Sequence, residues 1–374
     1  MEHPVYVNAM DEKQLELYCE LSNHPTSSDD LTRLVSLVLM PLTCILGILG
    51  ASICVIVFTR KQMRSSLNIY LAGLSAFDLI LLIMSLLIYP AMNICVLQGN
   101  RGQTCHFFWR SSLVTYPISL IAQTASVWTC VAITVDRFLA VKYPLHMRVW
   151  CTPRCAMVVL GCIAMISVVY KLPSVFELGL DECGRLMTTQ LRKHPLYIIF
   201  YISYGNLLLL LMIPWIVIIV LNVIIVKAVH AAYRLRRELC LNQPIEDENR
   251  CTKMATVTIV AFILLNSLSG INNVIEGFDL DVPGHRYRIP LGNLLVCVNS
   301  ASNILIYSIF GQRFRKLCVE LFLCKGYYSP NRNSGEHKTY LAPENSTRRA
   351  SSTYVMVDNS RRPSNAYIGL LAVE

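Results

Sequence analysis

Seven long stretches of the chain contain at most one Asp, Glu, Lys or Arg, and this pattern limits the possible folds more than any other feature. They are Leu34–Phe58, Leu67–Cys95 (with Asp78), Ser111–Val135, Cys155–Tyr170, Leu196–Val226, Met254–Ile275 and Ile289–Gln312. A membrane-spanning helix needs about 20 apolar residues, and the fourth stretch reaches this length if it continues to Phe176. Charged residues make up 15% of the chain, against about 25% in soluble domains. The sequence therefore predicts an all-α membrane protein, a seven-transmembrane helix bundle.

The charges outside these stretches predict how the bundle is oriented. Residues 1–31 are acidic and contain no apolar signal-peptide core. The segments after the first, third and fifth stretches are basic, for example at Arg60, Lys142 and Lys227. Since loops rich in Lys and Arg stay in the cytoplasm, we expect residues 1–31 to form an extracellular tail and residues 32–312 to form the transmembrane domain. The net charge of +9 reflects this asymmetry, so it is poor evidence for a nucleic-acid partner.

Residues 313–325 predict a short amphipathic helix after the seventh stretch. Phe314, Leu317 and Leu321 fall on one side of it and basic residues on the other, which suits a helix lying in the membrane interface. Cys318 and Cys324 are candidates for palmitoylation there; two free thiols are an equally good interpretation. Residues 326–374 are polar and rich in Ser, Asn and Arg, so we expect a disordered cytoplasmic tail.

The third stretch runs directly into an acid–arginine pair, Asp136-Arg137, and Tyr143-Pro144-Leu145 follows. Such a pair is costly inside hydrocarbon, so it must lie at the membrane edge or face a polar cleft. One interpretation of Arg137 is a long cation that extends from a helix end to the interface. The other interpretation is a conformational switch, and support for it must come from motifs elsewhere in the chain.

That pattern consists of several motifs in a fixed order along the seven stretches. LAGLSAFD contains Asp78, and Ser126, Pro214 and Asn299 follow before the closing motif NILIY at Asn303–Tyr307. With the Asp-Arg pair, these features resemble the rhodopsin-like (class A) G-protein-coupled receptors over roughly residues 34–324. The resemblance implies a receptor in the plasma membrane, without enzymatic chemistry or a cofactor, whose partner is a heterotrimeric G protein.

Further segments are similar to invertebrate FMRFamide-type neuropeptide receptors. They are AQTASVW (Ala122–Trp128), YKLPSVFE (Tyr170–Glu177), NIYLAGLSAFD (Asn68–Asp78) and FTRKQM (Phe58–Met63). The likeness implies a peptide ligand, and the family name suggests an amidated peptide ending in Arg-Phe. In the sixth stretch Leu265–Leu268 stands where other receptors carry Cys-Trp-x-Pro, as is also the tendency in this group.

The resemblance implies a switch at the cytoplasmic end of the bundle. Asp136 would hold Arg137 in the resting state, and outward movement of the sixth helix would free the guanidinium for the G protein. Leu145 would enter an apolar pocket on the Gα subunit. Asn303 and Tyr307 belong to the same switch by position. In the tail, two Arg pairs precede Ser351 and Ser364, which suggests kinase sites and arrestin-type partners.

Asp78 is a lone acid among apolar residues, so it must point into the bundle. The family pattern places Ser126, Asn299 and Asn303 beside it. Their oxygens, with water, would suit a sodium ion at Asp78 and Ser126. A hydrogen-bonded network without an ion is an equally good interpretation, because Ala51 replaces one usual member of this cluster.

The ligand site is implied by family position and by charge. Ser119 stands where amine receptors carry an aspartate, so an amine ligand is not expected. A guanidinium favours bidentate pairing with a carboxylate, and Glu177 and Glu276 are the candidate partners for the ligand's arginine. The alternative is that these acids only solvate loops. The deeper wall is expected to contain polar and aromatic residues, namely Tyr116, Ser119, Gln123, Asn273 and Asn293.

Two alternatives to a peptide receptor stay open: a receptor for a small chemosensory molecule, and a transporter or channel. The second is disfavoured because Asp78 is the single deep charge and no repeat is visible. For the cysteines on the outer side, we favour a Cys105–Cys183 disulfide. Cys19 and Cys95 pair with each other or compete for these partners, because connectivity cannot be deduced from one sequence.

Overall fold

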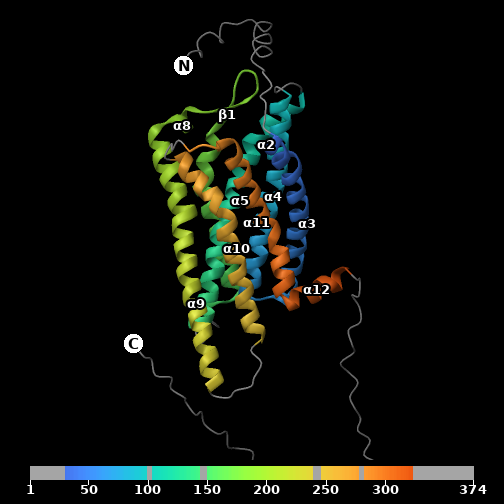
Figure 1. The fold of residues 1–374 in the computed structure, drawn as a ribbon, viewed down its shortest axis with the longest axis vertical. Helices are drawn as coiled ribbons and strands as arrows, with labels where there is room; N and C mark the ends of the chain where they lie inside the picture. Colours follow the sequence, from blue (N-terminus) through green and yellow to red (C-terminus); the bar gives the residue numbers. More distant parts are fainter. Residues whose placement is uncertain (1–29, 99–102, 144–149, 239–245, 278–281, 323–374) are drawn as a thin grey trace, which may run out of the picture. The chain divides into compact units, whose positions relative to one another are not determined.

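The computed structural model describes residues 30–98, 103–143, 150–238, 246–277 and 282–322, with side chains described except at 232–233, 235–255, 276–277, 285–286 and 322. Within these ranges, seven helices are long and apolar enough to cross a membrane. They lie side by side in one bundle (Figure 1). The seven-transmembrane prediction is therefore confirmed.

Each span contains almost all of the uncharged stretch that predicted it. The first span combines α2 (Asp30–Leu34), a π-helical turn and α3 (Met40–Phe58). The fifth combines π-helical segments at Tyr197–Gly205 and Leu207–Met212 with α9 (Ile213–Glu238). The other spans are α4 (Ser66–Leu97), α5 (Gln103–Lys142), α7 (Pro153–Lys171) with a 3₁₀ turn at Leu172–Phe176, α10 (Glu246–Gly277) and α11 (His285–Phe310).

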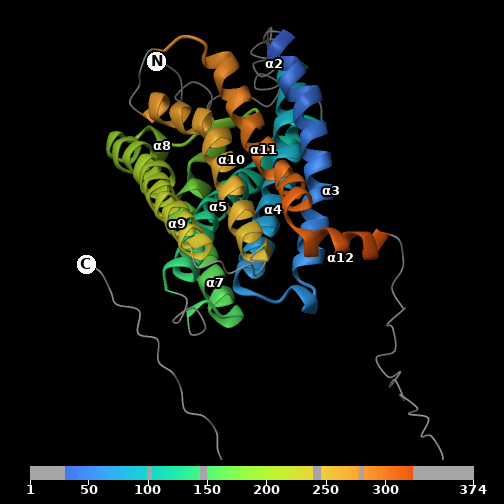
Figure 2. The same cartoon turned by 60° about the horizontal axis from the view of Figure 1, so that its bottom comes forward.

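Helix α5 is the central helix of the bundle. It packs against α4, α7 and α9, while α3 packs against α4 and α11, and α10 packs against α11. In its most apolar window, 56% of α5 is buried, compared with 17% for the span Pro153–Phe176. Figure 2 shows α5 enclosed by its neighbours. Functional side chains on α5 therefore face other helices, whereas much of α7 faces the surroundings.

Local sequence signals explain where two helices begin. The Ser65 hydroxyl accepts a hydrogen bond from the Asn68 backbone at 3.2 Å, which caps α4. Thr152 caps α7 in the same way through the Cys155 backbone, also at 3.2 Å. Proline at the first position of α7 suits a helix start, because its missing N–H would have no partner there. These caps fix both helices at the end of the bundle that carries Arg137, called here the Arg137 end.

The opposite end, called here the Glu177 end, carries a short antiparallel hairpin. Strand β1 (Leu178–Leu180) pairs with β2 (Leu186–Thr188), and α8 (Gln190–Lys193) follows (Figure 1). Gly184 has a φ of 70° in the turn, a conformation that glycine adopts without strain. The Asp181 carboxylate accepts hydrogen bonds from the backbone and side chain of Arg185 at 2.7 and 2.9 Å. The hairpin therefore covers this end as a defined structure.

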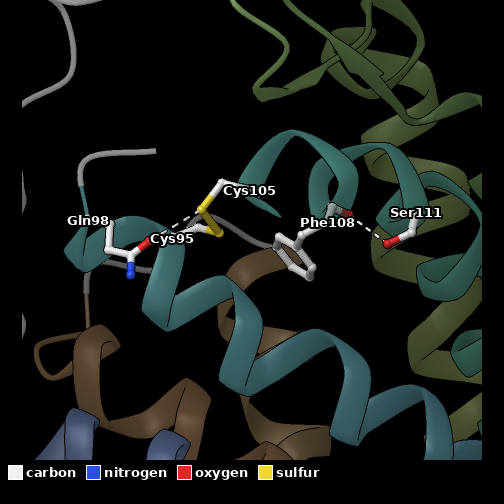
Figure 3. The surroundings of a disulfide bond; sticks show 5 residues. All are labelled: Cys95, Gln98, Cys105, Phe108 and Ser111. Carbon is white, nitrogen blue, oxygen red and sulfur yellow. Dashed lines mark hydrogen bonds between the residues drawn. A yellow bond between two sulfur atoms is a disulfide. The ribbon is translucent and has the colours of Figure 1, made fainter. Parts of the chain in front are cut away.

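The predicted Cys105–Cys183 disulfide is wrong. Cys105 is bonded to Cys95, with the two Cα atoms 5.5 Å apart (Figure 3). Cys95 lies near the end of α4 and Cys105 near the start of α5, so the short connection between these helices brings them together. Cys183 is also disulfide-bonded. The family pattern suggested a disulfide from Cys105 to the loop after the fourth helix, but Cys105 instead bonds to Cys95 on the adjacent helix.

Helix α12 (Gln312–Phe322) follows α11 and turns away from the bundle (Figure 2). Phe314 is fully buried, and its ring centroid lies 5.1 Å from that of Phe58 and 5.9 Å from that of Tyr307. Cys318 is partly buried against the same cluster, and this burial raises the pKa of its thiol. A less available thiolate makes acylation at Cys318 harder. Cys324, the other predicted lipidation site, lies outside the described residues.

Candidate functional site

The bundle interior contains a cavity of about 500 Å³ that opens among α4, α5, α9, α10, α11 and the hairpin. This volume lies in the usual range for ligand pockets. Six of the seven predicted ligand residues line it: Tyr116, Ser119, Gln123, Glu177, Asn273 and Asn293. The seventh, Glu276, lies near the end of α10, and its side chain is outside the described part of the chain. The predicted ligand residues are therefore largely brought together.

Glu177 is held by two partners. Arg192 donates from Nη1 to Oε2 at 2.9 Å, and Tyr197 donates its hydroxyl to Oε1 at 2.8 Å. The Glu177 side chain is only 6% exposed, so its charge is removed from bulk water. A buried carboxylate requires such compensation. The cavity wall therefore already contains a carboxylate with a guanidinium bound to it.

Lys171 is a second buried charge in this wall, and the sequence interpretation did not select it. Its residue is 3% exposed and lines the cavity. Nζ donates to Asn206 Oδ1 at 2.8 Å and lies 4.8 Å from the centre of the Tyr170 ring and 5.7 Å from that of Tyr201. The sequence signal for this residue is the lysine of YKLPSVFE, which ends a membrane-spanning helix and stands six residues before Glu177.

Two further polar atoms at the cavity lack hydrogen-bond partners within the described structure. They are Trp109 Nε1, a donor, and Asn272 Oδ1, an acceptor. Both residues line the cavity and are more than nine-tenths buried. Asn272 is anchored through its Nδ2, which donates to the Arg288 carbonyl at 2.8 Å. A buried group without a partner is costly, so these atoms favour a ligand that has both an acceptor and a donor.

Below the cavity, Asp78 is the centre of a polar cluster that links three helices. Its Oδ1 accepts hydrogen bonds from Ser126 at 2.9 Å and Ser300 at 2.8 Å, and its Oδ2 accepts one from Asn303 at 2.7 Å. Asp78 is fully buried. Of the predicted partners, Asn299 is buried on the same helix but makes no hydrogen bond to Asp78 in the described structure. Ser300, which the sequence interpretation missed, takes that place.

At the Arg137 end, Arg137 is bound to the acid that precedes it. Its Nε donates to Asp136 Oδ2 at 3.2 Å, and its Nη2 contacts the same oxygen. The Asp136 side chain is 5% exposed and that of Arg137 15%. Tyr307 is fully buried, with its hydroxyl lacking a partner among the described residues. Leu145, the predicted knob, lies outside the described part of the chain.

A comparison with protein families agrees with this geometry. Residues 51–307 match the model of the seven-transmembrane receptors of the rhodopsin family. The chain belongs to this family. It is a family of signalling receptors rather than enzymes, as the sequence predicts, and the chain is therefore a multi-pass membrane protein.

Comparison with individual proteins shows which receptors of this family the chain resembles. The chain is 32% identical to an FMRFamide receptor of Drosophila melanogaster, over 76% of this chain and 53% of that receptor. It is 31% identical to an FMRFamide peptide receptor of Caenorhabditis elegans, over 74% of this chain and 66% of the relative. It is also 25% identical to the human galanin receptor type 1, over 78% and 82%. The chain thus spans about half to two thirds of the length of the FMRFamide receptors it matches.

This rhodopsin-family receptor departs from the usual Cys-Trp-x-Pro pattern at a position that lines the cavity. Asn266 lines the cavity where the sixth helix of many receptors is expected to carry tryptophan, and its Nδ2 donates to the Phe262 carbonyl at 2.8 Å. At Asn266 the cavity wall therefore has a smaller and more polar side chain than the family pattern suggests.

Proposed function

We propose that this receptor is a plasma-membrane neuropeptide receptor whose N-terminus is extracellular and whose ligand is an amidated peptide ending in Arg-Phe. The observation that carries the proposal is the buried Glu177, which already binds a guanidinium in the cavity wall. The ligand's arginine would exchange with Arg192 for this carboxylate. The FMRFamide receptors among the relatives support the same ligand class.

The rest of the cavity suits the amidated end of such a peptide. A terminal carboxamide has one acceptor oxygen and two N–H donors. Trp109 Nε1 and Asn272 Oδ1 are a donor and an acceptor without partners in the described structure, and Tyr116 provides an aromatic surface in the same cavity. The uncharged Ser119, whose hydroxyl donates to the Tyr116 carbonyl at 2.8 Å, supports a peptide over an amine.

Signalling would run through the Arg137 end, which lies in the cytoplasm in the predicted orientation. The Asp136–Arg137 pair is intact here, as in a receptor at rest. Peptide binding shifts the population toward a state in which Arg137 leaves Asp136 and meets a G protein, to the extent that the peptide binds that state better. Phosphorylation at Ser351 and Ser364 and recruitment of arrestin belong to the same proposal.

The sodium site is also part of the proposal, since the oxygens around Asp78 fit a small hard cation. Ser126 and Ser300 place two hydroxyl oxygens at the carboxylate, and each hydroxyl keeps lone pairs that can turn toward an ion. Such an ion would neutralise the buried charge and favour the resting state. The alternative, a network of hydrogen bonds alone, uses the same residues.

The test uses cells that express the receptor, a panel of amidated Arg-Phe peptides and a readout of G-protein activation. Glu177→Gln should reduce the potency of these peptides at least tenfold, because a desolvated charge pair is lost. Asp181→Asn is the matched control, since it removes an acid of the same hairpin that does not line the cavity. Each peptide is also tested with citrulline in place of arginine, and this neutral analogue should be insensitive to Glu177→Gln.

Three outcomes would contradict the proposal. Silence toward every amidated peptide at normal surface expression would refute the ligand class. Full response of Glu177→Gln and Glu276→Gln variants would favour a small-molecule receptor that does not use these acids. Ion or solute flux that Asp78→Asn abolishes would favour a transporter or channel.

A further inference from the structure

The charges in the cavity wall do not balance. Of the described residues that line it, three are charged: Lys171, Glu177 and Arg192. Glu177 is already paired with Arg192, and Lys171 belongs to none of the ion pairs of the described residues. A peptide that brings an arginine adds another positive charge to the same desolvated space. The cavity therefore has an excess of positive charge that its own described side chains do not neutralise.

Lys171 is fixed in place rather than free to reach water. Its ammonium is held by Asn206 Oδ1 at 2.8 Å, and Asn206 is itself oriented because its Nδ2 donates to the Ile202 carbonyl at 2.9 Å. The Tyr201 hydroxyl donates to the Tyr170 carbonyl at 2.8 Å, and the Tyr170 hydroxyl donates to Asn206 Oδ1 at 3.2 Å; these two bonds fix the rings beside the ammonium. An ammonium has three donors, and Asn206 is its one hydrogen-bond acceptor in the described structure.

These neighbours stabilise the cation without neutralising it. Aromatic faces and an amide oxygen attract a positive charge, and the position at the end of α7 adds the favourable helix dipole. They provide no countercharge themselves. The Glu177 carboxylate attracts the ammonium at longer range, but it is already paired with Arg192, and burying an ion without a direct partner of opposite charge is costly. The arrangement holds a cation at the surface of a ligand cavity with hydrogen-bonding capacity unused, which is how a protein would present a charge to an anionic group.

We propose that Lys171 forms a second charged subsite of the cavity, which binds an acidic side chain of the peptide. The inference rests on the proposed function and extends it: the ligand would carry an acidic residue in addition to the arginine that Glu177 binds. Lys171 and Glu177 would then bind two opposite charges on one peptide. This would distinguish amidated Arg-Phe peptides that carry an acidic residue from those that do not.

The experiment compares matched peptides on matched receptors. The probes are Gly-Phe-Met-Arg-Phe-NH₂ and three pairs of analogues, in which Gly, the first Phe or Met is replaced by Asp or by its neutral isostere Asn. The receptors are wild type, Lys171→Gln, Lys171→Arg and Lys193→Gln. Lys193→Gln is the control, since Lys193 is an exposed lysine of α8 that does not line the cavity. Surface expression is measured for each variant.

In at least one pair, the Asp peptide should be about tenfold more potent than the Asn peptide on the wild-type receptor, as for a desolvated charge pair. Lys171→Gln should reduce this ratio to about one by weakening the Asp peptide alone. Lys171→Arg and Lys193→Gln should retain the preference.

Equal potency within every pair on the wild type would overturn this inference and leave the proposed function intact. A preference for Asp that persists in Lys171→Gln would also overturn it. If Lys171→Gln lowers the potency of both peptides of a pair equally, at normal surface expression, Lys171 only maintains the shape of the cavity, and the inference is overturned. A receptor that answers none of the probes, nor any other amidated peptide, would overturn the proposed function and this inference together.

Discussion

Replacing Ser300 by alanine tests whether the structure has identified the correct partners of Asp78. The substitution removes one of the three hydrogen bonds to the carboxylate, the one from Ser300 Oγ at 2.8 Å. The lost bond is fully buried, and a hydrogen bond to a buried acid contributes about 1–3 kcal/mol. We therefore expect Ser300→Ala to lower the stability of the receptor by that amount.

The assay is thermal unfolding of the purified receptor, with single variants and with the same variants in an Asp78→Asn background. Ser302→Ala is the matched control on the same helix, because among the described residues the Ser302 hydroxyl donates to the Asn299 carbonyl of its own helix alone, at 2.8 Å. Its loss should cost less than about 0.5 kcal/mol. In the double-mutant cycle, Ser300 should couple to Asp78 by about 1 kcal/mol or more, whereas Asn299 should show almost no coupling.

The opposite result would refute the assignment. If Asn299→Ala couples to Asp78 and Ser300→Ala does not, the family position is the correct guide and α11 is rotated relative to the arrangement described here. If neither residue couples, the carboxylate depends on Ser126 and Asn303 alone, and the oxygen set proposed for sodium loses a member.

Two further predictions concern cysteines. We expect the same loss of stability in Cys95→Ser, in Cys105→Ser and in the double variant, about 3 kcal/mol for a loop closed over a sequence separation of 10. Peptide mapping that links Cys105 to Cys183 would contradict this. Burial, with a smaller effect from Asp136, raises the pKa of Cys151 to about 11. The reactive thiolate is therefore scarce at pH 7.5, and alkylation of Cys151 should accelerate about tenfold for each pH unit up to pH 10. In the denatured receptor the same thiol should level off near pH 9, and a native profile that levels off there would contradict the burial.

The spans could be predicted from the sequence because the bilayer acts directly on composition. A helix in hydrocarbon cannot carry many charges, so an uncharged stretch such as Ser111–Val135 identifies its helix, here α5. What composition does not encode is the backbone geometry inside a span. The π-helical segments Tyr197–Gly205 and Leu207–Met212 lie within one uniformly apolar stretch, and nothing in that stretch separates a π-helical from an α-helical turn.

The sequence predicted which residues belong to the site better than it predicted which of them contact one another. Adjacent residues on a helix point about 100° apart, so the choice between Asn299 and Ser300 as partner of Asp78 depends on the rotation of α11, and both are small polar residues. The partners of Glu177 are Arg192 and Tyr197, which follow the hairpin in the sequence. Contacts of this kind arise only when the helices are assembled, and motif positions do not determine them.

The arrangement along α5 gives a physical reason for the cavity and the Asp78 cluster to act together. Gln123 lines the cavity, and Ser126, one turn further along, donates to Asp78 at 2.9 Å. Three residues of helix cover only about 4.5 Å, so any rotation of α5 that improves contact between Gln123 and a peptide also moves the Ser126 hydroxyl relative to the carboxylate. Affinity for the peptide and affinity for whatever occupies the Asp78 cluster are then linked, and by thermodynamic reciprocity each must change the other by the same factor.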